Sequence, residues 1–264
     1  MQTARSEISS AFIWRRVHSL MGLWLVLYLM LHLFTNSQAA LWLGDDGGGF
    51  IQMVNSLESL PYLAEIETVL IGVPLAIHGV WGIHRALTAR LNSQGAGGSL
   101  PVLKYGRNRA FTWQRLTSWI LLLGVVGHVA QMRFAEQPKK VETGWAVHIT
   151  PDATLPGIAA RLGIQLSDES ANRVLATAPT PGAAMLLMVR DTFKSPLMVV
   201  LYTIFVLAAA FHAFHGFWTF LITWGVILSY RSQKAMIPLS VIGMGLLTFF
   251  GFAAIYGSYW LSHV

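Results

Sequence analysis

Four of the nine histidines in this 264-residue chain lie well inside long apolar segments: His32, His78, His128 and His212. Ionisable side chains are costly inside a membrane and usually mark function there. One such histidine could be a simple polar link between helices, but one on each of four consecutive segments makes that explanation much weaker. Imidazole is a common axial ligand of haem iron, and helix bundles build cofactor sites from side chains on facing helices. The four histidines therefore point to haem chemistry within a membrane.

The composition indicates the class of protein that must hold these histidines. Hydrophobic residues make up 54% of the chain and charged residues only 11%, whereas soluble domains carry roughly 25% charged residues. So few charges exclude a soluble enzyme, and so many apolar residues exclude a disordered chain. The absence of cysteine excludes disulfides, a cysteine nucleophile and an iron–sulfur cluster held by this chain. The sequence predicts an all-α integral membrane protein.

Five apolar segments are each close to the roughly 20 residues that a helix needs to cross the hydrocarbon core. They cover residues 17–37, 63–87, 113–132, 196–229 and 236–261. The fourth segment is long enough to tilt or to extend beyond the bilayer. The connector 135–195 carries proline-containing stretches around Leu155-Pro156 and Thr180-Pro181, and we expect it to form a small ordered cap.

Lys and Arg residues near the span ends set the orientation, because cytoplasmic loops carry an excess of them. Eleven of the 18 lie on the side of the N-terminus: Arg5, Arg15, Arg16, Arg85, Arg90, Lys104, Arg107, Arg109, Arg115, Arg231 and Lys234. We therefore expect a cytoplasmic N-terminus, an extracytoplasmic C-terminus and an extracytoplasmic connector 135–195. This cytoplasmic basic face accounts for the formal net charge of +6, so no nucleic-acid partner is expected.

The depth of each histidine follows from the helical rise of about 1.5 Å per residue. His32 and His128 lie roughly 24 and 20 Å outward from the inner-face arginines of their spans. His78 lies about 10 Å from the inner face, and His212 about 27 Å from the outer face of a core roughly 30 Å thick. The four therefore fall into an outer layer, His32 with His128, and an inner layer, His78 with His212. Two bis-histidine haems use all four.

Other residues near these layers are further candidates. His215 shares nearly the same helix face as His212 and competes with it as a ligand. His18 lies on the face of His32 but at the inner boundary. It belongs to a group suited to binding the propionates of an inner haem or a partner subunit: Arg15, Arg16, His18 and Ser19.

Small residues and one proline accompany the histidines. Gly82, Gly124 and Gly216 each lie four residues from one of the four, and residues four apart share a helix face. We expect these glycines to leave room for a flat macrocycle. Pro74, four residues before His78, is expected to kink the second span.

Several stretches of the sequence resemble the cytochrome b subunit of succinate:quinone oxidoreductases, in the five-helix, two-haem class that includes succinate dehydrogenases and fumarate reductases. They occur in order on all four histidine-bearing spans and on the last inner loop. The stretches are RRVHSLMG (15–22), MLHL (30–33), PLAIHGVWG (74–82), QRLT (114–117), FHAFHGFW (211–218), TWG (223–225) and RSQ (231–233). The connector 135–195 departs from the class because it is longer than expected.

The resemblance implies a single transmembrane cytochrome b domain over residues 1–264, in which helices I–IV bind two haems b. The family's axial ligands fall on His32 and His128 for the outer haem iron and on His78 and His212 for the inner haem iron. The family pattern tends to place asparagine at position 215, which favours His212 over His215 as the ligand.

The resemblance also implies partners and a place. A flavoprotein (FAD) subunit interconverts succinate and fumarate, and an iron–sulfur subunit docks on the cytoplasmic face of this chain. Electrons pass between that subunit and a membrane quinone, expected to be menaquinone, through the two haems. The chain would be a multi-pass protein of the bacterial cytoplasmic membrane, would contact lipid, and would carry out the quinone half-reaction without a dicarboxylate site.

A quinone headgroup needs hydrogen-bond donors near the outer haem. The leading candidates are Asn36, Glu58, Glu65 and Gln131, with Gln38, Glu67 and Arg133 at the same level; Ser19, Gln114 and Trp224 could form a second site near the inner haem. Two other functions stay open from the residues alone. One is the cytochrome b subunit of a nitrate reductase, hydrogenase or formate dehydrogenase, and the other is a haem-free transporter whose histidines relay protons.

Overall fold

The structure, a computed structural model, describes residues 9–88, 102–170 and 172–263. Five helical stretches in these ranges are long and apolar enough to cross a membrane: Ser10–Ser37, Leu63–Thr88, Gly106–Ala135, Pro196–Thr223 and Tyr230–Gly257. Each overlaps one of the five predicted segments, with ends that differ by up to seven residues, which confirms the predicted five-helix membrane architecture. Arg5 and Arg90, two of the predicted inner-face arginines, lie outside the described residues.

Irregular elements divide several of these stretches. The first is the single helix α1 (Ser10–Ser37), and the second combines α3 (Leu63–Glu67), the π-helical η2 (Thr68–Gly72) and α4 (Val73–Thr88). The third combines α5 (Gly106–Val129) with the π-helical η3 (Ala130–Ala135). The fourth is α8 (Pro196–Thr223), and the fifth combines α9 (Tyr230–Ala235) with α10 (Ile237–Gly257).

The fourth span ends earlier than the sequence predicted. It was expected to run from 196 to 229, but α8 stops at Thr223. Gly225 follows with a φ of 76°, a left-handed conformation that glycine adopts without steric cost and that ends helices. The Ser229 hydroxyl then accepts a hydrogen bond from the backbone N–H of Ser232 and starts α9.

Pro74 leaves one backbone carbonyl of the second span without its α-helical partner, and the predicted kink stays a prediction. An α-helix would pair the Leu70 carbonyl with the N–H of residue 74, and proline has none. The indole Nε1 of Trp24 donates to that carbonyl instead, at 2.6 Å. Leu70 belongs to the π-helical η2, which ends at Gly72, two residues before Pro74 and six before His78.

The described chain divides into two compact units. The first consists of Met1–Leu29, Ala64–Trp119 and Ala210–Met244, and the second of Met30–Leu63, Ile120–Ala209 and Gly245–Val264. The two histidine pairs predicted from depth fall one in each unit: His78 and His212 in the first, His32 and His128 in the second.

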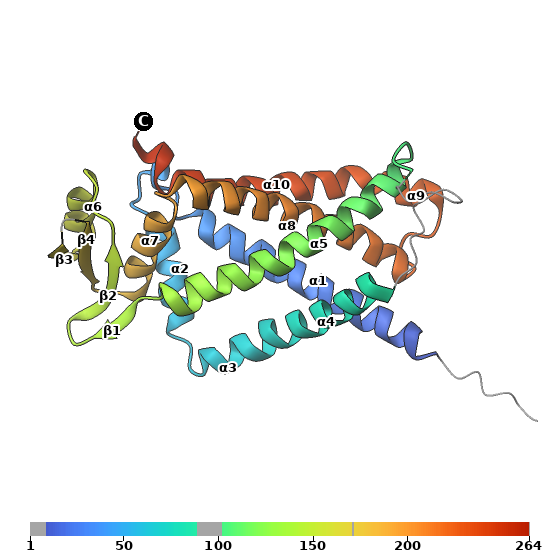
Figure 1. Cartoon of the computed structure of the whole chain (residues 1–264), viewed down its shortest axis with the longest axis horizontal. Helices are drawn as coiled ribbons and strands as arrows, with labels where there is room; N and C mark the ends of the chain where they lie inside the picture. Colours follow the sequence, from blue (N-terminus) through green and yellow to red (C-terminus); the bar gives the residue numbers. More distant parts are fainter. Residues whose placement is uncertain (1–8, 89–101, 171, 264) are drawn as a thin grey trace, which may run out of the picture. The chain divides into compact units, whose positions relative to one another are not determined.

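The second unit contains a folded cap that corresponds to the connector 135–195. Strands β1 (Lys139–Val141), β2 (Gly144–Ile149), β3 (Gln165–Ser170) and β4 (Arg173–Ala178) form an antiparallel sheet in the order β1-β2-β4-β3 (Figure 1). The helices α6 (Leu155–Leu162) and α7 (Pro181–Thr192) complete it. An ordered cap was predicted, but the sheet was not.

Helix α7 joins the cap to α2 (Gly48–Glu58), which follows the short η1 (Leu41–Leu43). The N–H of Gly182 donates to Oδ1 of Asn55 at 2.8 Å. A Cβ at position 182 would lie 2.5 Å from the carbonyl oxygen of Ile51, so only glycine permits this close approach of the two helices. Phe50 and Val54 of α2 share one buried core with Leu187 of α7.

A buried ion cluster fixes the cap. The guanidinium of Arg190, whose side chain is 2% exposed, binds both carboxylate oxygens of Asp152 at 2.6 and 2.7 Å. Lys194 lies 2.8 Å from the same carboxylate, and the Thr154 hydroxyl donates to it at 2.7 Å. Partial burial opposes ionisation of Asp152, but the hydrogen bonds from Arg190, Lys194 and Thr154 outweigh it and hold the pKa of this carboxyl well below its usual range.

Candidate functional site

The first unit brings three predicted histidines together. The rings of His78 on α4 and His212 on α8 have their centroids 6.2 Å apart and are nearly perpendicular, at 83°. The ring of His18 on α1 stacks on that of His78 at 4.0 Å and 9°. His78 therefore lies between α1 and α8, with one imidazole on each side of it.

The backbone fixes the protonation pattern of His78. Its Nδ1 lies 3.1 Å from the carbonyl oxygen of His18. A carbonyl can only accept a hydrogen bond, so Nδ1 carries the hydrogen and Nε2 keeps a free lone pair. Metal-ligating histidines usually donate their other ring N–H to a carbonyl or carboxylate in this way.

Gln114 on α5 distinguishes His212 from His215. Its amide Nε2 donates to the carbonyl of His212 at 3.2 Å, and its Oε1 lies 3.0 Å from Nδ1 of His215. His215 also stacks on Phe211 at 5.5 Å and 5°. His215 is therefore engaged with Gln114 and Phe211, whereas the His212 ring is the one beside His78.

Glycines admit these rings, although not all in the predicted way. A Cβ at Gly22 would lie 2.9 Å from Cε1 of His78; this close approach was not predicted. A Cβ at Gly82 would lie 3.6 Å from Cε1 of His18, and one at Gly216 would lie 3.7 Å from Nε2 of Gln114. Room for a macrocycle beside these glycines stays a prediction.

The four residues predicted to bind haem propionates or a partner subunit fall into two sets with different surroundings. Arg15 and His18 line a cavity of about 180 Å³ together with Ala11, Trp81 and Arg85. Nδ1 of His18 is buried there without a hydrogen-bond partner, a feature that calls for a further polar group. Two cationic guanidinium groups at such a cavity suit an anionic carboxylate.

Arg16 and Ser19 instead tie α1 to the end of α8. The indole Nε1 of Trp224 donates to the Ser19 hydroxyl at 2.9 Å, and that hydroxyl donates to the carbonyl of Arg16 at 3.0 Å. The Arg16 guanidinium donates to the carbonyl of Thr223 at 3.4 Å. Ser19, Trp224 and Gln114, the candidates for an inner quinone site, are thus all engaged in contacts between helices.

The second unit contains the other pair of predicted haem-ligand histidines. The rings of His32 on α1 and His128 on α5 have centroids 5.8 Å apart at 80°. The ring of Phe205 packs directly on Gly124, where a Cβ would collide with it, and lies 6.1 Å from the His128 ring. Gly124 therefore admits an aromatic side chain beside His128.

A hydrogen-bonded chain starts at His128 and was not predicted. Its Nδ1 lies 3.2 Å from the hydroxyl of Tyr202 on α8, which donates to Oε1 of Gln131 at 3.1 Å. Nε2 of Gln131 donates to the carboxylate of Glu136 at 3.0 Å, and the Thr192 hydroxyl donates to the same carboxylate at 3.1 Å. Depth along α8 could have identified Tyr202, because it lies about 12 Å from Lys194, which the charge distribution places at the predicted outer face.

The four leading quinone candidates occupy different surroundings. The amide of Asn36 donates to the carbonyl of His32 at 2.8 Å. Gln131 belongs to the row of hydrogen bonds that starts at His128. Glu58 is the last residue of α2, and Glu65 is exposed on α3 in the first unit. Their role in quinone binding stays a prediction.

These donor sets fit haem better than a bare metal ion. No three His, Cys, Asp or Glu side chains in residues 9–88, 102–170 and 172–263 form a group that could hold a metal ion. Two imidazoles suffice for haem, because the macrocycle supplies the remaining ligands of the iron. The two pairs are the predicted ones, and their role as haem ligands stays a prediction.

Comparison with known proteins connects this arrangement to a family. No family model matches the chain, and no solved structure matches it. A curated protein does: the succinate dehydrogenase cytochrome b558 subunit of Bacillus subtilis (strain 168) is 29% identical over 246 residues, which cover 93% of this chain and 96% of that protein. Along almost its entire length the chain is thus a relative of a succinate dehydrogenase cytochrome b subunit, which confirms the resemblance read from its sequence.

Proposed function

We propose that this chain is the membrane-anchoring cytochrome b subunit of a bacterial succinate dehydrogenase. It binds two haems b, one between His78 and His212 and one between His32 and His128. The relative named above supports the cytochrome assignment. The observation that carries the proposal of two haems is the occurrence of two separate imidazole pairs, with ring centroids 6.2 and 5.8 Å apart.

The chain's own residues orient the imidazole rings. The carbonyl of His18 holds the hydrogen of His78 on Nδ1, and Tyr202 occupies Nδ1 of His128. Nε2 of each ring is then the atom left for iron. When bound, haem supplies reversible one-electron transfer. Arg15 and Arg85, at the cavity beside His18, hold a carboxylate of the inner group.

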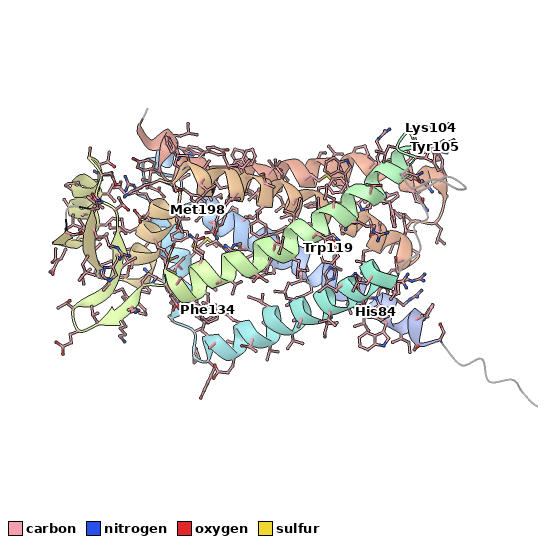
Figure 2. The ribbon with its side chains drawn as sticks, in the orientation of Figure 1. His84, Lys104, Tyr105, Trp119, Phe134 and Met198 are labelled. Atoms are coloured by element: carbon pink, nitrogen blue, oxygen red, sulfur yellow. The ribbon has the colours of Figure 1, made fainter. Side chains whose placement is uncertain are left out.

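Charge supports docking of the partner subunits at the basic end of the first unit. Among the described residues of this unit, nine Lys and Arg side chains gather there, and the carboxylates, Glu65 and Glu67, both lie on α3. Lys104 and Tyr105 lie together at the N-terminal end of α5 (Figure 2), with the ammonium 5.1 Å from the ring centroid. Such a face is complementary in charge to an iron–sulfur subunit with an acidic surface. Its excess of basic residues also favours a cytoplasmic location.

A haem count on the purified complex tests the proposal. The tagged chain is expressed with its partner subunits, solubilised in detergent and analysed by the pyridine haemochrome method. We expect two haems b per chain, both reduced when succinate is added. The variant His215→Ala is a matched control because this residue lies three positions from His212 and should keep both haems. A complex without haem contradicts the proposal. Haems that succinate does not reduce, but that formate or hydrogen reduces or that nitrate reoxidises, would assign the chain to another respiratory enzyme.

A further inference from the structure

In the row of hydrogen bonds that links His128 to Glu136, each donor and each acceptor is fixed by its chemistry. The row begins at the Glu136 carboxylate, which can only accept hydrogen bonds when ionised. The amide of Gln131 must therefore turn its Nε2 toward Glu136, at 3.0 Å, and its Oε1 toward Tyr202. An amide turned the other way would place oxygen against oxygen.

The same reasoning assigns the donor and the acceptor between Tyr202 and His128. Oε1 of Gln131 can only accept, so the Tyr202 hydroxyl donates its single hydrogen to it, at 3.1 Å. The Tyr202 oxygen is left as an acceptor toward Nδ1 of His128, at 3.2 Å. His128 is consequently held with its hydrogen on Nδ1 and a lone pair on Nε2.

We propose that Glu136, Gln131 and Tyr202 form a positioning relay that selects the Nε2-ligating tautomer of His128 and lowers the reduction potential of the outer haem. This inference rests on the proposed function, because it requires a haem between His32 and His128. A hydrogen bond from the second ring nitrogen raises the basicity of a ligating imidazole. A more basic ligand favours the oxidised, more highly charged iron. In the inner pair, by comparison, Nδ1 of His78 lies against a backbone carbonyl, and Nδ1 of His212 lies 3.5 Å from the Thr117 hydroxyl.

Two variants in the full complex test the relay. Tyr202→Phe removes the acceptor, and Glu136→Gln removes the carboxylate that gives the chain its direction. The readout is the midpoint potential of each haem, from redox titration of the absorption spectrum. For Tyr202→Phe we expect the outer haem to be about tenfold easier to reduce, a shift of about 59 mV upward for a one-electron couple. Glu136→Gln should shift it in the same direction by less, and the inner haem should not move.

Tyr256→Phe is the matched control. It removes a hydroxyl that lies 2.8 Å from Thr203, one residue along α8 from Tyr202, and it should leave both potentials unchanged. Outer potentials equal to the wild type in both relay variants would overturn the inference. If Tyr202→Phe fails to retain the outer haem, Glu136→Gln decides alone, because Glu136 is exposed. Absence of haem from the wild-type complex would instead refute the proposed function.

Discussion

The side chain of His78 is hydrogen-bonded to the backbone of His18, sixty residues earlier, and not to its imidazole. Nδ1 of His78 lies 3.1 Å from the His18 carbonyl oxygen, while the two rings stack at 4.0 Å. The bond that orients His78 therefore survives any substitution of the His18 side chain that leaves the helix intact. The two histidines should accordingly respond very differently to mutation.

The first prediction separates these two roles. His78→Ala removes a proposed ligand and should lower the haem content from two per chain to one. His18→Ala keeps the carbonyl and should retain both haems, with lower thermal stability because a buried ring contact is lost. Pyridine haemochrome analysis and a thermal melt of the purified complex measure both effects. Loss of a haem in His18→Ala together with its retention in His78→Ala would reverse the assignment.

The second prediction concerns Gly22, which packs against the ring of His78. Gly22→Ala places a methyl group 2.9 Å from Cε1 of His78, closer than carbon atoms normally approach, so the ring or helix α1 must shift. We expect reduced occupancy of the inner haem and an unchanged outer haem, measured by haem content and low-temperature absorption spectra. Gly79→Ala is the control, since nothing lies within 4 Å of a Cβ there. Equal behaviour of the two variants would refute a role for this contact.

The third prediction concerns the cap. Asp152→Asn leaves the guanidinium of Arg190 buried without its charge partner, and breaking a buried pair costs about 3 kcal/mol. We expect the cap to lose stability in thermal or denaturant unfolding followed by tryptophan fluorescence. Asp46→Asn is the matched control: its partner, Arg161, has a side chain that is 55% exposed, and exposed pairs contribute little. A cap equally stable in both variants would contradict the prediction.

The same carboxylate gives a fourth prediction, for pH. The pKa of Asp152 is held below its usual range, so the ionised group is bound more strongly in the folded cap than in the unfolded chain. This stabilisation is fully present above the ordinary aspartate pKa of about 3.9 and is lost as the pH falls through the lower folded-state pKa. Unfolding of the cap should depend on this group only below about pH 4. Asp152→Asn should flatten that acid limb, and an unchanged limb would count against it.

The fifth prediction tests the docking face. Arg231→Glu combined with Lys234→Glu reverses two exposed charges at α9 and should weaken association with the flavoprotein and iron–sulfur subunits about tenfold, or 1.4 kcal/mol. Added salt should weaken the wild-type complex by the same mechanism. Co-purification of the partner subunits with the tagged chain measures it. Lys139→Glu with Lys140→Glu, on exposed β1, is the control; an equal effect there would disprove a specific face.

The membrane architecture and the histidine pairs could be predicted because each depends on one simple quantity. Hydropathy alone located the five spans, since a helix in lipid needs a long apolar stretch. Counting the rise per residue placed His32 with His128 and His78 with His212, and the structure has these rings in contact. Neither prediction required knowledge of how helices turn their faces.

The remaining features depend on three-dimensional detail that no local pattern carries. The strands of the cap are three to six residues long, too short for an alternating pattern to stand out. The neighbours of Gly82 and Gly22 depend on which helix packs against each face, and the two glycines proved to contact His18 and His78 respectively. Tyr202 could be placed at the right depth, but its contact with His128 depends on how α8 is rotated.

The π-helical η3 has an evolutionary consequence. The N–H of Glu136 bonds to the carbonyl of Gln131, five residues back, at 2.8 Å, so this turn holds one residue more than an α-helical turn. Removing one residue from Ala130–Ala135 would restore α geometry and rotate everything beyond it by about 100°. Glu136 would then point away from Gln131. Relatives that lack this extra residue should also lack selection for tyrosine at position 202, so the length of one turn and the identity of one residue on another helix are expected to vary together.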